Sequence, residues 1–219
     1  MTNRQKSKFN IEVNKHQSLR YYQYNPTGSK NKLPLMLFLH GRGERGENLD
    51  LVETHGIPKL IKEGKSFPFI TIAPQCPLGT WWSDPEAICS LSSLMDKIIT
   101  SKIINISQIY CTGLSMGGYG TLALSIKRPE LFAAVAPVCG GVDERNFFHL
   151  DKIKDLPIWM FHGDEDDVIP VSNSERVFEG LRQKNKQVKL TKYRGVGHNA
   201  WDRTYQNQEL YNWILKHKK

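Results

Sequence analysis

The sequence has no long hydrophobic run, and this absence excludes several classes of protein. No stretch of about 18 apolar residues occurs, so a membrane span is not expected. The first residues are basic but no apolar segment follows them, which argues against a secretory signal. A cytoplasmic location is therefore expected, with secretion the alternative if a leader was removed upstream. Internal repeats, linkers and low-complexity segments are also lacking, so one domain over residues 1–219 is expected.

Cysteine is scarce, and its four positions show neither a C-x-x-C motif nor metal-ligand spacing, so no metal site is expected. Cys111 and Cys139 lie in apolar runs, where a free cysteine behaves as a small core residue. Cys76 and Cys89 flank a loop and would pair only in an oxidising compartment; the reduced form is favoured.

Acidic residues are fewer than basic ones, 22 against 30, and the formal net charge is +8. The basic residues between positions 184 and 194 alternate with polar and apolar residues rather than with aromatic ones. That pattern favours a solvated basic face over a nucleic-acid groove, so no nucleic-acid partner is expected. Nothing in the sequence selects an oligomeric state.

Apolar runs alternate with helix-like segments, which is typical of the α/β class with a mostly parallel sheet and helices on both faces. Strands are expected at residues 9–13, 19–24, 35–39, 69–73, 109–114, 133–138, 156–161 and 188–193, with a turn at 25–28 after the second. Helices are expected at residues 49–62 (interrupted near 56–58), 89–102, 119–126, 172–184 and 209–216. Ser172 and Glu175 have the spacing of a capping box.

Residues 109–120 combine a strand-like apolar run with a segment of small residues that opens a helix. Ser115 lies at the junction, inside the pattern Gly113-x-Ser115-x-Gly117, which is typical of a nucleophile elbow. Small residues recur in any loop, so the pattern alone also fits an ordinary strand-to-helix turn. A catalytic interpretation of Ser115 requires further catalytic residues elsewhere in the chain.

A serine nucleophile needs a base, and the base needs an orienting acid. His198 follows the last expected strand, in a loop with glycines at 195 and 197, and lies where the base is required. His40 and His162 each precede a glycine in a turn and are expected to hydrogen-bond loops. The acid is expected after the strand at 156–161, in a run of four carboxylates at 164–167. Chemistry alone leaves Asp164, Asp166 and Asp167 open.

An oxyanion hole needs two backbone N–H donors. The N–H of Met116 lies at the start of the helix after Ser115, and the loop after residue 39 is placed to supply the second, for which Arg42 is chosen. The Arg42 side chain is expected to form a salt bridge with Glu44 or Glu47.

Four motifs in this order, at residues 39–46, 113–118, 162–166 and 197–198, resemble the α/β-hydrolase superfamily. The closer similarity is to its compact phospholipase/carboxylesterase and dienelactone-hydrolase-like branch, often described as predicted peptidases. The resemblance implies an α/β-hydrolase fold and a triad of Ser115, Asp166 and His198. No insertion long enough for a large lid occurs between residues 138 and 156, so an open site is expected. It also implies no cofactor and no metal. Dienelactone hydrolases proper use cysteine where Ser115 stands, and Arg42 replaces a residue that is often small or apolar.

The expected function is a serine carboxylesterase that hydrolyses small or aryl- or sugar-linked carboxylic esters through an acyl-enzyme. A small-molecule ester is thus the expected partner. Alternatives on the same triad are an acyl thioesterase or lysophospholipase and a small peptidase, and a further alternative is a binding protein that retains the fold without activity. Trp81 and Trp82 are expected near the rim of the site, where substrate stacking and loop packing are equally good interpretations.

Overall fold

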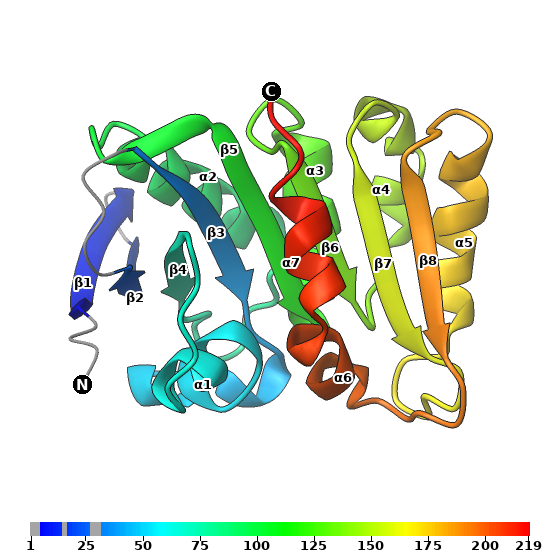
Figure 1. Cartoon of the computed structure of the whole chain (residues 1–219), viewed down its shortest axis with the longest axis horizontal. Coiled ribbons are helices and arrows are strands. Elements are labelled where there is room, and N and C mark those ends of the chain that lie inside the picture. The colour runs from blue at the N-terminus through cyan, green and yellow to red at the C-terminus, as the bar shows by residue number, and fades with distance from the viewer. Residues whose placement is uncertain (1–4, 15–16, 27–31) are drawn as a thin grey trace.

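The computed structural model describes residues 5–14, 17–26 and 32–219, and its strands form one mixed sheet (Figure 1). The order across the sheet is β1-β2-β4-β3-β5-β6-β7-β8. The strands span β1 Gln5–Asn14, β2 Gln17–Asn25, β3 Leu33–Leu39, β4 Ile70–Pro74, β5 Ile104–Leu114, β6 Ala134–Val138, β7 Ile158–Gly163 and β8 Val188–Tyr193. All expected strands are therefore confirmed. The expected turn at 25–28 falls partly outside the described residues, at Thr27 and Gly28.

The sheet is parallel from β4 to β8, while β1 and β2 form an antiparallel hairpin that pairs antiparallel with β4. In β3, Leu35 and Leu37 pack into one hydrophobic core and Met36 and Phe38 into the other. A strand that is covered on both faces must be apolar at successive positions, which explains the uninterrupted run at 35–39.

Helices cover both faces of the sheet. In the view of Figure 1, α2 (Pro85–Ile98), α3 (Met116–Lys127), α4 (Glu144–Phe147) and α5 (Ser172–Arg182) lie behind it, and α1 (Gly56–Lys62) and α7 (Gln208–Ile214) lie in front. Helix α6 (Ala200–Gln206) lies near the edge where the parallel strands end. Three short 3-10 helices complete the described elements: η1 Arg42–Glu44, η2 Leu49–Glu53 and η3 Leu150–Ile153. The α/β-hydrolase architecture is confirmed.

Two details of the expected helices are wrong. Helix α2 begins at Pro85, four residues before the expected start, because a proline at the first helical position is favourable. The capping box is absent from α5: its N-cap is Val171, which makes no side-chain cap, and Ser172 is already helical. Glu175 pairs instead with Lys192 of β8, at 2.9 Å.

The parallel strands all end at the lower edge of Figure 1, so the loops that follow them gather there. This is the edge at which open α/β sheets bind their ligands. In the described part of the chain, no helix combines the length and the hydropathy that crossing a bilayer would require.

Candidate functional site

The elbow is formed as its sequence predicts. Strand β5 ends at Leu114, helix α3 begins at Met116, and Ser115 between them has φ 54° and ψ −118°. This is a costly backbone conformation for a residue with a side chain, and it is held by surrounding contacts. The Ser115 N–H donates to Val138 O at 2.9 Å, and Ser115 O accepts from the Gly118 N–H at 2.8 Å. The turn therefore presents the serine hydroxyl at a fixed position.

Two glycines of the motif are required by close backbone contacts. A Cβ on Gly113 would collide with Gly117 O, and a Cβ on Gly117 would collide with Leu39 O at the end of β3. Helix α3 thus starts directly against the neighbouring strand, and only glycine permits that approach.

A single imidazole links the serine to a carboxylate. His198 Nε2 lies 3.0 Å from Ser115 Oγ, and His198 Nδ1 lies 2.8 Å from Asp166 Oδ2. The three residues come from loops after β5, β7 and β8 and are 83 and 32 residues apart along the chain. The structure thus brings together the three residues that the sequence analysis selected, and the imidazole lies between the hydroxyl and the carboxylate.

The environment of Asp166 keeps it ionised. Burial opposes ionisation of this carboxyl, but hydrogen bonds from His198 and from the N–H groups of Ile169 and Val168 outweigh burial and lower its pKa. Its side chain is fully buried, whereas 19% of the His198 side chain remains exposed. The acid is therefore shielded while the base stays accessible to a substrate or water.

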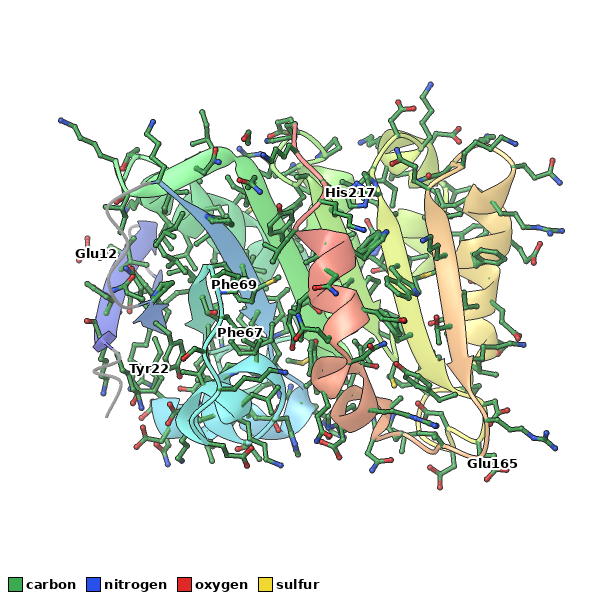
Figure 2. All side chains as sticks on the ribbon, viewed as in Figure 1. Glu12, Tyr22, Phe67, Phe69, Glu165 and His217 are labelled. Carbon is green, nitrogen blue, oxygen red and sulfur yellow. The ribbon has the colours of Figure 1, made fainter. Side chains whose placement is uncertain are left out.

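The other two candidate acids lie elsewhere. Asp164 Oδ1 accepts the N–H of Gly195 at 2.7 Å and so ties the loop after β7 to the loop after β8. The Glu165 N–H donates to Val196 O at 3.0 Å and joins the same two loops; Figure 2 labels Glu165 at this edge of the molecule. Asp167 is exposed. These contacts hold the acid loop and the base loop in one arrangement.

The two expected oxyanion donors are each the first residue of a helical segment. Met116 is the first residue of α3, and Arg42 is the first residue of η1, so neither N–H has a carbonyl one turn earlier to bond. The salt bridge expected for the Arg42 side chain is wrong: among the described residues, neither Glu44 nor Glu47 pairs with it. Glu44 is buried and faces His40 and His55, and the Arg42 guanidinium lies 5.9 Å from the centre of the Trp81 ring.

The two tryptophans have different environments. Trp82 is completely buried, packs against Gly120 of α3, and donates its indole N–H to His40 O at 3.1 Å. A role for Trp82 in substrate stacking is therefore wrong, since no face of its ring is free. Trp81 is 44% exposed, and both Arg42 and Arg45 lie over its ring, Arg45 at 5.3 Å from the centroid.

Sequence reasoning missed the contact between His162 and the acid. His162 bonds a loop as expected, with Nε2 2.8 Å from Ile169 O, but the same nitrogen also lies 3.2 Å from Asp166 Oδ2. The sequence shows that His162 and Asp166 are four residues apart, but this spacing does not indicate that the loop folds back and brings the two side chains together. His40 is also confirmed as a loop-bonding residue, since its Nε2 accepts the N–H of Cys76.

Among the described residues, one group has donor atoms close enough together to resemble a metal site. It consists of buried Cys139, His162 and Asp166, whose donor atoms all lie within 4.8 Å of one another. Burial raises the pKa of the Cys139 thiol to about 12, so it keeps its proton, and the other two side chains are engaged in hydrogen bonds. This chemistry favours a hydrogen-bonded cluster over a metal centre. All four cysteines are free, so the disulfide alternative for Cys76 and Cys89 is wrong.

The fold and this loop cluster define an α/β hydrolase with a serine, a histidine and a carboxylate in contact at the carboxyl edge of its sheet. The model of the phospholipase/carboxylesterase family matches residues 84–217, more than half of the chain. The protein belongs to this family, whose members are carboxylic ester hydrolases.

The sequence identity to individual relatives is low. The chain is 27% identical over 137 residues to poly(3-hydroxyalkanoate) depolymerase C of Paucimonas lemoignei, with 57% of this chain and 32% of the relative covered. It is 28% identical over 197 residues to the bifunctional acetylxylan esterase/xylanase XynS20E of Neocallimastix patriciarum, with 87% and 27% covered. The chain thus spans about a third or less of these relatives.

Among solved structures, a thermostable esterase superposes with a TM-score of 0.83 at 31% identity, with 98% of this chain and 63% of that chain covered. The likeness extends over the elbow, the acid loop and the base loop, because nearly the whole of this chain is aligned.

Proposed function

We propose that the protein is a serine carboxylesterase in which Ser115 is the nucleophile, His198 the general base and Asp166 the orienting acid. The main support is the placement of one imidazole within 3.0 Å of the serine hydroxyl and 2.8 Å of a buried carboxylate. A serine hydroxyl is a poor nucleophile at neutral pH, and this arrangement is the one that activates it.

In the proposed reaction, Ser115 Oγ attacks the ester carbonyl while His198 Nε2 takes its proton. Asp166 stabilises the imidazolium and keeps Nδ1 protonated, and the N–H groups of Met116 and Arg42 stabilise the oxyanion. The protonated His198 then gives its proton to the departing alcohol, which leaves an acyl-enzyme. Water enters past the exposed part of His198 and repeats the two proton transfers, so the acid product departs and Ser115 is restored.

The substrate class that we propose is a small acyl group linked to a sugar or an aryl alcohol. Trp81 is 44% exposed and lies next to Arg42, whose N–H is the proposed oxyanion donor. Sugar rings and aryl groups both stack on indole faces. The relative whose name includes acetylxylan esterase adds weight to a sugar-linked acyl group.

The proposal is tested with the purified chain on a panel of esters: p-nitrophenyl acetate, butyrate and palmitate, methyl ferulate and acetylated xylan, beside an acyl-CoA and a peptide anilide. Hydrolysis of the short, aryl or acetylated-xylan esters is expected, with loss in Ser115→Ala. A fluorophosphonate probe should label wild type and not that variant. Exclusive turnover of the anilide or thioester would overturn the ester assignment, and absence of labelling would overturn the nucleophile.

A further inference from the structure

A cavity of about 280 Å³ lies between helices α2, α3 and α4, away from the serine. Its wall includes Ala123 of α3, which is eight residues beyond Ser115, or about 12 Å along a helix that rises 1.5 Å per residue. None of the residues that line the cavity belongs to the triad or to the proposed oxyanion hole, so it is distinct from the proposed ester site. Its volume is near the lower end for small-molecule sites, so it suits a small ligand.

The floor of the cavity is aliphatic. Ile88 of α2 and Ala123 and Ile126 of α3 contribute to it, and each is nearly buried within the main core cluster. Apolar atoms of a ligand that lie against this floor would be removed from water, which is favourable in proportion to the area covered.

The rim of the cavity is cationic. Lys127 at the end of α3, Arg145 in α4 and Lys152 in η3 line it, against one carboxylate, Asp143. That carboxylate is already engaged: its Oδ1 accepts the Asn146 N–H at 2.8 Å and its Oδ2 lies 3.6 Å from Arg145. Over the described ranges, Lys127 and Lys152 have no carboxylate within ion-pair distance. Two positive charges are thus left without a counter-ion beside an aliphatic floor.

We propose that this cavity is a second ligand site that binds a short aliphatic carboxylate, with the alkyl chain on the floor and the carboxylate between Lys127 and Lys152. Charge-assisted hydrogen bonds to the two ammonium groups fix the head, and burial of the chain supplies the remaining affinity. The apolar part of the ligand is proposed to be aliphatic rather than aromatic because the floor of the cavity presents alkyl side chains. The assignment does not depend on the ester chemistry at Ser115.

Cys89 provides a reporter for this site. It lines the cavity and is exposed, whereas Cys76, Cys111 and Cys139 are buried. A neutral maleimide should therefore modify Cys89 first in the folded protein. Occupancy of the cavity should slow that reaction, and mass spectrometry identifies the modified residue.

The experiment measures the rate of Cys89 modification, and the heat of binding, as octanoate is titrated into wild type and Ser115→Ala. Saturable protection is expected in both proteins. Octanamide, which keeps the chain without the charge, and inorganic phosphate, which keeps a charge without the chain, should each protect at least about tenfold more weakly. Benzoate separates an aliphatic from an aromatic preference.

Lys127→Glu combined with Lys152→Glu should weaken octanoate binding at least about tenfold and leave ester hydrolysis unchanged. The matched control is Lys186→Glu combined with Lys216→Glu, which makes the same change in net charge at exposed positions outside the cavity. Equal binding by both double variants, equal protection by octanamide or phosphate, tighter binding of benzoate, or no saturable protection would each overturn the proposal.

Discussion

His162 Nε2 lies 3.2 Å from Oδ2 of Asp166, the same oxygen that His198 Nδ1 approaches to 2.8 Å. His162 is completely buried, and its other ring nitrogen lies 2.7 Å from Ser174 Oγ. Because Nε2 is surrounded by two acceptors, Ile169 O and the carboxylate, it must carry the hydrogen. The acid that faces the proposed base is therefore flanked by a second, completely buried histidine, which bonds the same loop at Ile169 O and lies in polar contact with the carboxylate.

His162→Leu should lower kcat by about tenfold with KM little changed, since the bond to Ile169 O and the polar contact with Asp166 are both lost, which leaves the carboxylate less well fixed. His162→Gln, whose amide can donate at the position of Nε2, should recover part of the loss. Steady-state kinetics on p-nitrophenyl acetate measure both values, with circular dichroism as the check on folding. Equal kcat values for His162→Leu and wild type would contradict a positioning role.

Asp166→Asn should reduce kcat by about 10²–10⁴, because an amide cannot stabilise the imidazolium and favours the wrong tautomer of His198. The loss should be smaller than for Ser115→Ala or His198→Ala. Asp167→Asn is the matched control: it removes a neighbouring exposed carboxylate and should leave kcat within about twofold of wild type. Full activity in Asp166→Asn would mean that the acid is misassigned.

Gly117→Ala should prevent folding or destabilise the protein by more than about 4 kcal/mol, because the added Cβ would overlap Leu39 O in a rigid contact between strand and helix. Gly43→Ala is the control in the proposed oxyanion loop. A Cβ there meets no atom within 4 Å, so the free energy of unfolding should change by less than about 1 kcal/mol. Urea denaturation measures both changes. Similar stabilities for the two variants would show that the elbow tolerates a side chain.

The fold was readable from sequence because doubly buried strands such as 35–39 must be continuously apolar, and a serine elbow needs glycines at fixed positions. The choice among the carboxylates at 164–167 came from family resemblance, since local sequence does not say which side chain turns inward. That outcome depends on the Val168 and Ile169 N–H groups, which only the folded loop aligns. Likewise, adjacent tryptophans share a sequence context, yet Trp82 packs beneath α3 while Trp81 remains at the surface.

Helix α6 was missed for a related reason. Its seven residues bury Ala200, Trp201, Thr204 and Tyr205. So short a segment has little helical preference of its own, and its stability comes from packing rather than from propensity. The i, i+1, i+4, i+5 spacing of those buried residues was the available signal. The helix matters to the site because Trp201 packs edge-on against His198, with 5.0 Å between ring centroids.

His40 should make the protein sensitive to mild acid. Its Nδ1 lies 2.6 Å from Gly41 O and its Nε2 accepts the N–H of Cys76 at 2.9 Å, so the ring is bonded in its neutral form. Burial lowers the pKa of His40 to about 4 from 6.5, against the opposing effect of the Gly41 carbonyl and with a small contribution from Arg45. Between those two pH values the unfolded chain binds more protons than the folded one, so stability must fall as the pH falls.

The contribution of His40 to this loss should be roughly 3 kcal/mol on going from pH 7 to pH 4, since each pKa unit corresponds to about 1.4 kcal/mol. His40→Gln places a non-titrating donor and acceptor at the same position, and His149→Gln removes an exposed histidine as the control. Unfolding free energies in urea at pH 7 and pH 4 should show a loss that is about 3 kcal/mol larger in wild type than in His40→Gln. Buried Glu44, whose pKa is raised by burial, gains protons over the same range and lies 3.8 Å from His40, so the comparison is repeated in a Glu44→Gln background to separate the two groups. Parallel losses in wild type and His40→Gln would show that the ring is already charged in the folded state.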